Sequence, residues 1–305
     1  MTLREISVAF AKKQPKQVDY ITEEAPILNI IPFEASTHMM HNVYSEITSV
    51  TGAGFTDLDA ELPALAVNRI LKQAALSTMG GELSVGQDEA KAHGGRDAYF
   101  AKQTPVILRE SGSTTEYAIL YNMIRAAAIA NAAKINSGGS NNVNYSILAI
   151  KFVPGDTTGL YSPNGFASGV MLPFEWLNGG NLTKVTKGTT SINGYAGQFK
   201  NYFGFQIASA RNVAGIFNVD RTSATKKLPT EAQIDDLLDL VRASSENTFL
   251  LMHPKIKSYL KTFKTQRLTM VPGDKNYNRV LERWDDVRVI TSYNFLDATE
   301  ANVTF

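Results

Sequence analysis

The sequence has no cysteine among its 305 residues. This absence excludes disulfides, thiolate nucleophiles, thiolate zinc sites and cysteine-ligated iron–sulfur clusters. No charge sign dominates either, because 30 basic residues face 29 acidic ones. A protein dedicated to binding nucleic acid would carry an excess of Lys and Arg to contact phosphates. The composition therefore argues against both thiol chemistry and dedicated nucleic-acid binding.

Long apolar runs are also missing. The longest stretches, 126–133 and 146–153, fall far short of the roughly 18 residues that span a bilayer. Residues 1–10 lack the basic start and apolar core of a signal peptide. With 44% apolar residues, the chain has ordinary globular composition and the length of one large domain or two intertwined ones. We expect a protein made in a cytosol, with no membrane segment.

Sequence motifs of catalysis are absent as well. There is no Gly-x-x-x-x-Gly-Lys-Ser/Thr phosphate loop, no Gly-x-Ser-x-Gly nucleophile elbow and no His-Glu-x-x-His zinc motif. The cluster at 51–54 lacks the third glycine and following helix of a dinucleotide-binding loop. His38 and His41 could offer two imidazoles to a metal, but no third ligand follows at a supporting spacing. We expect no enzyme activity, metal or cofactor, and a surface or interface role for the histidines.

A Val-Pro-Gly-Asp sequence occurs twice, at 153–156 and at 271–274. Asp156 and Asp274 could in principle act as an acid and base pair, which keeps a hydrolase as a distant alternative. Pro-Gly followed by Asp is first of all typical of a turn. We therefore interpret both copies as turns.

The first 35 residues are predicted to form an N-terminal arm that ends where the chain enters the core. Residues 1–26 have mixed charge and are interrupted by prolines, which indicates an extended arm, whereas 27–33 is a dense apolar run. Residues 1–18 hold four basic residues against one acidic residue, Glu5. The arm is therefore mildly basic, and its basic residues are Arg4, Lys12, Lys13 and Lys16.

Residues 36–75 predict a long hairpin, because polar and β-branched positions alternate through 43–50 and a glycine-containing turn follows at 51–54. Between Val43 and Asn68 there is no Lys or Arg, and the four charged residues are all acidic: Glu46, Asp57, Asp59 and Glu61. Phe55, next to the turn, is the natural aromatic anchor into a neighbouring molecule. The alternative is a hairpin tip folded back onto its own core.

The middle of the chain predicts a helix in pieces. Gly80-Gly81 is expected to break the secondary structure. Helix-forming residues begin at Gln87, and breaks in the helix are expected at Gly94-Gly95 and Pro105. Ser113 and Glu116 match a capping box, which predicts a helix from there to about Ile135.

The remainder is predicted to be rich in strands and then mixed. Strands are expected over 145–153, 195–209, 213–219, 248–252 and 287–293, with an edge-like segment at 302–305. Thr230 with Gln233 predicts a capped helix, and Pro254 predicts the start of another.

Several segments, in this order, resemble one known family. The family is the tailed-bacteriophage major capsid proteins with the Hong Kong 97-type fold. Leu28 to Phe33 resembles the apolar Pro-Phe segment that precedes the extended loop in its short-tailed-phage members, and Gly80 to Val85 resembles the Gly-Gly-Glu segment that leads those proteins into the long helix. Gly194-Tyr195, Tyr202 to Phe205 and Arg211 to Asp220 resemble the family's aromatic strand pair and its Arg-x-Val-x-x-Ile-x-Asn-x-Asp strand. Gly215 departs from the family, where a basic residue is frequent.

The resemblance implies an α+β fold with four intertwined parts. These are the N-terminal arm (1–35), the extended β-hairpin loop (36–85), a β-rich peripheral domain with the long spine helix (86–220) and an α+β axial domain with a C-terminal strand (221–305).

It also implies a major capsid protein that assembles in the host cytoplasm, as pentamers and hexamers of itself, into an icosahedral virion shell. The implied partners are scaffolding, portal and cement or decoration proteins, and the packaged double-stranded DNA, touched non-specifically. An encapsulin-type nanocompartment shell protein is the alternative within the same fold.

Two expectations concern subunit contacts. The basic arm and the acidic hairpin are complementary, so we hypothesise that the arm of one subunit clamps the hairpin of another through Lys12, Lys13 and Lys16. Some capsids of this fold join a hairpin lysine to a neighbouring asparagine, but residues 43–68 contain no lysine. We expect no covalent cross-link from that stretch.

Overall fold

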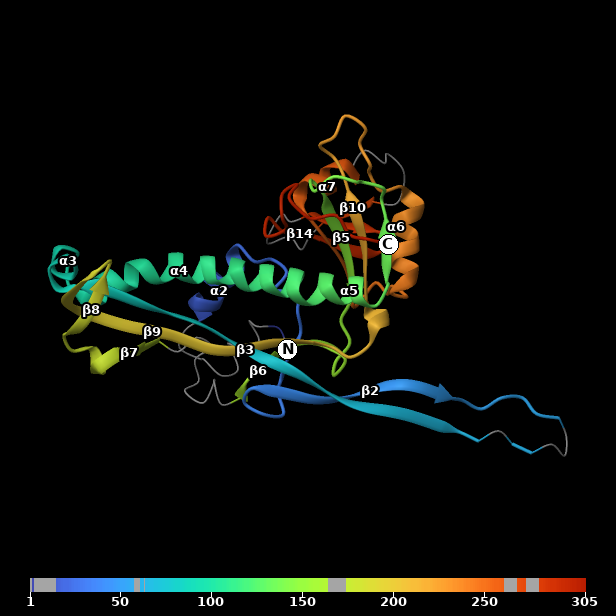
Figure 1. Ribbon diagram of the computed structural model, residues 1–305, viewed down its shortest axis with the longest axis horizontal. Helices are drawn as coiled ribbons and strands as arrows, with labels where there is room; N and C mark the ends of the chain where they lie inside the picture. Colours follow the sequence, from blue (N-terminus) through green and yellow to red (C-terminus); the bar gives the residue numbers. More distant parts are fainter. Residues whose placement is uncertain are drawn as a thin grey trace.

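The computed structural model describes residues 2, 15–57, 61–62, 64–163, 174–260, 268–272 and 280–305. Side chains are described for these residues except 15–18, 187, 201, 268–272 and 280–282. Within them, two seven-stranded sheets are joined by a long helix, and a hairpin projects far from the body (Figure 1). The α+β class expected from the sequence is confirmed.

The first sheet is elongated and has the order β1-β6-β9-β3-β2, with β7 and β8 also pairing β9. Its strands are β1 (Phe33–Ala35), β2 (His41–Thr51), β3 (Ala66–Gly86), β6 (Thr157–Tyr161), β7 (Phe174–Trp176), β8 (Thr183–Lys187) and β9 (Thr190–Ile207).

Strand β3 runs without interruption through Gly80-Gly81, so the predicted break there is wrong. The two glycines pair with Lys200 and Phe199 of β9. A Cβ on Gly80 would lie 2.1 Å from the carbonyl oxygen of Phe199. Glycine is therefore needed at this position because the backbones of β3 and β9 approach closely.

The long helix lies along the first sheet (Figure 1). It follows the short α3 (Gln87–Ala92) and consists of α4 (Arg96–Ala118), a π-helical segment (Ile119–Arg125) and α5 (Ala126–Ala130). The predicted break at Gly94-Gly95 is confirmed, since both glycines have positive φ, at 87° and 107°. Pro105, by contrast, lies within α4.

Two other predictions about the helix are wrong. Ser113 and Glu116 lie in the middle of α4 and cap nothing. The helix also stops before the predicted end near Ile135, because Ala132 takes a positive φ of 55° and Lys134 already belongs to a strand.

The second sheet has the order β12-β13-β14-β11-β5-β10-β4. Its strands are β4 (Lys134–Asn136), β5 (Tyr145–Lys151), β10 (Val213–Val219), β11 (Thr248–Met252), β12 (Leu268–Pro272), β13 (Val280–Trp284) and β14 (Val287–Thr291). The strands predicted at 213–219 and 248–252 match β10 and β11. Strands from 134–219 thus share a sheet with strands from the last quarter of the chain, and the domain boundary at 220 stays a prediction.

Two helices accompany the second sheet, α6 (Glu231–Leu240) and α7 (Pro254–Leu260). The capping box that begins α6 is confirmed, because Thr230 Oγ1 accepts from Gln233 N at 3.3 Å and Thr230 N donates to Gln233 Oε1 at 3.0 Å. Apolar residues of both helices, including Leu237 and Ile256, pack against one face of this sheet. The other face joins a core that also takes in Leu120 and Ile124 of the long helix.

The arm contains a helix, α2 (Pro15–Glu23), where the sequence indicated extended chain. It packs on α4 so closely that a Cβ on Gly112 would lie 2.0 Å from the carbonyl oxygen of Ile21. Arg109 Nε and Glu23 Oε2 form an ion pair at 2.7 Å. Helix α2 is therefore fastened to the long helix.

The last residues, 301–305, form no strand, which corrects the predicted edge strand at 302–305. Instead, the Asn218 side chain donates to Val303 O at 2.9 Å and accepts from Val303 N at 2.8 Å. One side chain replaces the backbone partner that a neighbouring strand would supply.

Candidate subunit-interaction surface

The projecting hairpin consists of β2 and the first half of β3. Its register runs from His41↔Ala75 to Thr51↔Ala66. Pairing between β3 and β9 begins only at Leu76. Residues 66–75 therefore pair with β2 alone, and the hairpin extends away from the other strands of the first sheet and from the second sheet (Figure 1). The predicted hairpin is confirmed.

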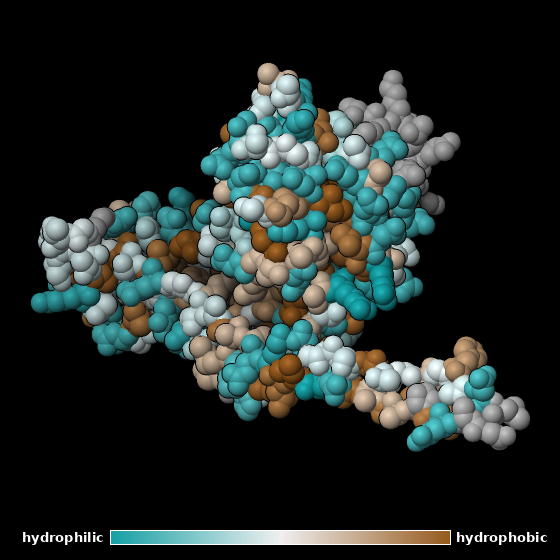
Figure 2. Space-filling model, turned by 45° about the vertical axis from the view of Figure 1, so that its right-hand side comes forward, coloured by the Kyte–Doolittle hydropathy of each residue, from teal (hydrophilic) through white to brown (hydrophobic). Residues whose placement is uncertain are grey.

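One face of the hairpin carries most of its large exposed apolar side chains, and Arg69 lies among them, opposite Ile47. Cross-strand partners share a face and successive residues alternate, so Ile47, Val67 and Leu71 lie on the same side. A register shift between Ile47 and Ser49 brings Val50 onto that side as well, opposite Val67. These four residues, the apolar stripe, are all exposed, with Leu71 at 75%. Figure 2 shows hydrophobic residues along the projecting hairpin.

The opposite face is mainly polar. Glu46 forms an ion pair with Lys72, and Asn68 Nδ2 donates to Ser49 Oγ at 2.8 Å. Ile70 is an apolar residue on this face and is 53% exposed. Because the polar groups satisfy one another within the hairpin, this face needs no partner, whereas the apolar stripe has none within the described chain.

The hairpin tip bears the aromatic residue that the sequence singled out. Phe55 is fully exposed, so the alternative of a tip folded back onto its own core is wrong for this residue. Asp57 and Glu61 are exposed beside it, and Asp59 lies outside the described residues. A role for these residues in subunit contacts stays a prediction.

The predicted contact between arm and hairpin is not tested by the structure. Lys12 and Lys13 lie outside the described residues, and the side chain of Lys16, in α2, is not described. The hairpin is less acidic than residues 43–68 alone suggest, because Arg69 and Lys72 follow directly and Lys72 pairs with Glu46. Sequence reasoning missed this partner because it lies across the strand pair.

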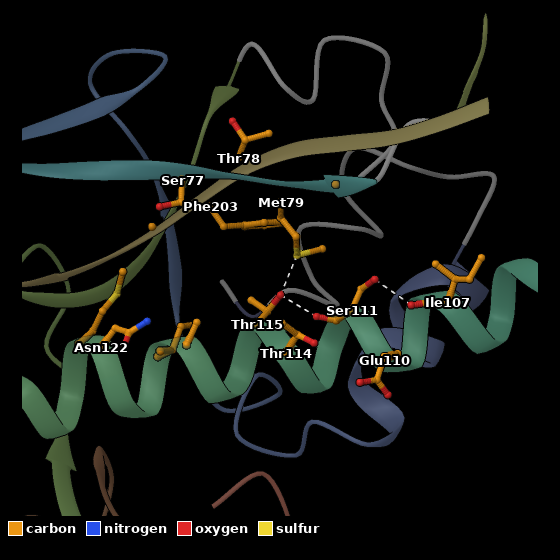
Figure 3. Close-up of a pocket in the computed structure, with 15 residues that line it drawn as sticks. Ser77, Thr78, Met79, Ile107, Glu110, Ser111, Thr114, Thr115, Asn122 and Phe203 are labelled. Carbon is orange, nitrogen blue, oxygen red and sulfur yellow. Dashed lines mark hydrogen bonds between the residues drawn. The ribbon is translucent and has the colours of Figure 1, made fainter. Parts of the chain in front are cut away.

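A second apolar surface lies between β3 and α4. It is a groove of about 520 Å³ (Figure 3). Its apolar lining comes from β3, from β9 and from the long helix. The Thr115 hydroxyl, which has one proton to donate, lies 2.7 Å from Ser111 O and 2.8 Å from Met79 Sδ, so the helix contacts the strand at the groove floor. The apolar lining residues are Met79, Ile107, Ala118, Ile119, Met123 and Phe203.

A buried carboxylate holds the long helix that forms one wall of this groove. Glu116 accepts hydrogen bonds from Ile27 N at 2.7 Å, from Leu28 N at 3.4 Å and from Asn294 Nδ2 at 3.0 Å, and it is also bonded by the Ser292 hydroxyl. Burial raises the pKa of Glu116. The residue predicted to cap a helix therefore joins the arm, α4 and the segment after β14.

A second buried carboxylate, Glu300, fastens the other end of the long helix. It accepts from Tyr121 OH at 2.6 Å, is bonded by Ser146 and forms an ion pair with Arg125 Nε at 3.3 Å. Burial raises the pKa of Glu300, and burial together with the adjacent carboxylate raises the pKa of Tyr121. These contacts give the groove a rigid wall.

The residues considered for chemistry do not form a catalytic or metal site in the described part of the chain. His38 and His41 lie side by side, with ring centroids 4.5 Å apart, but no group of three or more potential metal ligands is gathered there or elsewhere in the described ranges. Asp156 lies in a turn and accepts from Asn212 Nδ2 at 3.0 Å. Asp274 lies outside the described residues.

None of the described helices is long and apolar enough to cross a membrane.

Comparison with solved structures identifies the fold. The chain is similar to the structure of bacteriophage epsilon15, with a TM-score of 0.59 at 11% identity over 90% of this chain and 88% of that one. It is also similar to the bacteriophage JBD30 capsid, with a TM-score of 0.55 at 10% identity over 90% of this chain and 92% of that one. An elongated sheet, a long helix and a projecting hairpin thus define the Hong Kong 97-type capsid fold.

The family follows from the sequence. The family model "Major capsid protein GP7" matches residues 117–304, which is more than half of the chain. The chain belongs to this family of major capsid proteins. No curated protein sequence matches it.

Proposed function

We propose that this major capsid protein assembles with copies of itself into the icosahedral head shell that encloses the double-stranded DNA of a tailed bacteriophage. The family membership supports a structural, non-enzymatic role. The observation that carries the assembly proposal is the projecting hairpin with its exposed apolar stripe. A surface of this kind needs cover, because exposed contiguous apolar area marks interaction sites.

The hairpin of one subunit docks, in this proposal, into the groove between β3 and α4 of the next. The apolar stripe and the groove lining are complementary in character, and they lie on different parts of the same chain. A contact between two different surfaces of identical chains is head-to-tail and closes into a ring when the rotation fits. Pentamers and hexamers are such rings, and obligate interfaces of this kind bury roughly 2,000 Å² or more.

Phe55 is the proposed aromatic anchor of this contact, since exposed aromatic residues that enter a partner's pocket contribute most to binding. The basic arm, through Lys12, Lys13 and Lys16, is proposed to steer and register the contact with Asp57, Asp59 and Glu61. Contacts at the rim of an interface act on association rate and register more than on affinity. The further partners proposed are scaffolding, portal and cement proteins, and the place of action is the virion capsid after assembly in the host cytoplasm.

The near-neutral chain suits a container for DNA. With 30 basic and 29 acidic residues, its attraction to DNA phosphates is nearly balanced by the repulsion between its carboxylates and those phosphates. Each phosphate contact would release counterions and hold the DNA in place. A neutral wall touches the packaged DNA non-specifically and lets it move.

The test is to express the full chain, separate it on a sizing column and image the early fractions by negative-stain electron microscopy. Rings or closed shells are expected, with nucleic acid inside particles from infected cells. Shells that enclose a protein cargo would instead support an encapsulin-type nanocompartment. A chain that stays monomeric, also when expressed with the scaffolding protein of its own virus, would contradict the proposal.

A further inference from the structure

Two arginines face each other across the β13–β14 hairpin. Arg283 pairs with Arg288, one position away from the turn. The two turn residues, Asp285 and Asp286, both have positive φ, at 42° and 66°, as a tight two-residue hairpin requires. Directly opposed residues project from the same face of a sheet, so the two arginine side chains leave the sheet side by side.

The two guanidinium groups have unmet hydrogen-bonding capacity. The Nε atoms of Arg283 and Arg288 are buried and have no hydrogen-bond partner. Neither arginine forms an ion pair within the described ranges. Like charges directly opposite each other destabilise a strand pair, and a buried charged donor without an acceptor adds to that cost. An anion placed beside the pair would offset the repulsion between the two positive charges.

The surroundings strengthen any charge interaction at this place. Arg288 is in register with Phe249 on β11, which is buried and contacts Phe152 with ring centroids 5.6 Å apart. An aromatic neighbourhood lowers the local dielectric, so both the repulsion between the arginines and their attraction to an anion are larger than in water.

We propose that Arg283 and Arg288 form a binding site for carboxylate side chains of a second copy of this chain. The planar guanidinium group presents paired donors that match the two oxygens of a carboxylate. This inference rests on the proposed function, because it assigns a second contact between shell subunits. It differs from the hairpin contact in location and in chemistry.

Helix α6 supplies the complementary group. It contains four acidic residues and no basic one. Asp236 and Asp239 are exposed and take part in no ion pair within the residues that the structure describes. Within the residues that the structure describes, each copy thus has a cationic pair and two exposed aspartates without ion-pair partners, and a head-to-tail contact would pair them.

The experiment is a charge exchange in the full chain. One variant carries Arg283→Glu with Arg288→Glu, a second carries Asp236→Lys with Asp239→Lys, and a third carries all four changes. Assembly is followed by light scattering against protein concentration, and thermal unfolding shows that each variant folds. Each double reversal is expected to raise the concentration needed for assembly about tenfold or more, and the fourfold variant is expected to restore it. Reversals that assemble like the wild type, or a folded fourfold variant that is not restored, would overturn the inference.

A measurement on the unassembled chain separates this inference from the proposed function. If the wild type forms no shells, also when expressed with the scaffolding protein of its own virus, the proposed function fails, and the arginine pair is tested by titrating inorganic phosphate and following the melting temperature. A saturable rise in the wild type that is lost in Arg283→Gln with Arg288→Gln supports the anion site. An equal response of the two proteins overturns it.

Discussion

Glu116, in the middle of α4, accepts a hydrogen bond from the backbone N–H of Ile27 at 2.7 Å, although 89 residues separate the two in the chain. Both residues are completely buried. A carboxylate is favoured here because it accepts from the backbone N–H of Ile27; it also lies 3.4 Å from Leu28 N, which donates to Ala25 O at 3.1 Å as well. This contact fastens the point where the arm enters the core to the helix that walls the groove.

Replacing Glu116 with Leu is expected to lower the free energy of unfolding by about 3 kcal/mol, because it leaves the buried N–H of Ile27 and one Nδ2 hydrogen of Asn294 without their acceptor. Urea denaturation of the purified chain measures the change. Glu110→Leu is the matched control, since Glu110 is exposed on the same helix. Equal stability of the two variants would contradict the role assigned to Glu116.

The stability of the chain is expected to depend on pH through Glu300. Its pKa lies above the ordinary value of 4.5, chiefly because of burial, so the folded state binds the proton more tightly than the unfolded state. Its stabilising contribution is therefore complete below the unfolded pKa and is lost as the pH rises through the folded pKa.

The measurement compares the wild type with Glu300→Gln, which does not titrate, by urea denaturation from about pH 4 to about pH 8. The stability of the wild type relative to the variant is expected to fall as the pH rises above 4.5. A relative stability that grows with pH would mean that the pKa of Glu300 is lowered by Arg125 rather than raised by burial.

The apolar stripe predicts a difference between two adjacent positions of β3. Leu71→Asp places a charge on the stripe and is expected to block assembly, whereas Ile70→Asp places the same charge on the polar face and is expected to leave assembly intact. Both positions are exposed in the single chain, so the free energy of unfolding should change by less than about 1 kcal/mol in either variant. Sizing chromatography and electron microscopy read out assembly. Equal effects at the two positions would rule out the assignment of faces.

The basic arm predicts that assembly depends on the arm's charge and that this dependence weakens with salt. Reversing Lys12, Lys13 and Lys16 to Glu is expected to slow assembly at low salt, because the arm would then repel the acidic hairpin tip. The difference from the wild type should shrink at high salt, since charges separated by more than about 8 Å are screened near physiological ionic strength. Assembly rates that are unchanged at every salt concentration would remove the proposed clamp.

The absence of lysine from residues 43–68 predicts that assembled shells contain no covalent cross-link from this stretch. The nearest hairpin lysine, Lys72, is engaged by Glu46 on the polar face. Boiled shells should run as a single monomer band on a denaturing gel. A ladder of covalent multimers would show that the prediction is wrong.

The sequence by itself determined those elements whose signals are local. The mainly apolar run at 213–219 predicts a buried strand from its own residues, and the side chains of Thr230 and Gln233 need only their own turn to cap α6. The order of such segments was sufficient for the resemblance to phage capsid proteins, which the family match confirms. The exposed Phe55 followed from its place beside a turn.

Only the tertiary structure decided those contacts that join residues far apart in the chain. Ser113 and Glu116 have the spacing of a capping box, yet that spacing also occurs inside a helix. Glu116 instead accepts hydrogen bonds from Ile27, Ser292 and Asn294. In the sequence, Gly80 suggests a break in secondary structure. The structure shows that glycine is needed there because a Cβ would lie 2.1 Å from the carbonyl oxygen of Phe199 in β9. The apolar stripe depends on one register shift after Ile47, and the arginine pair depends on the β13–β14 register. Long-range pairing sets these contacts, because the side chains that meet are chosen by the packing of whole strands and helices rather than by their neighbours in the chain.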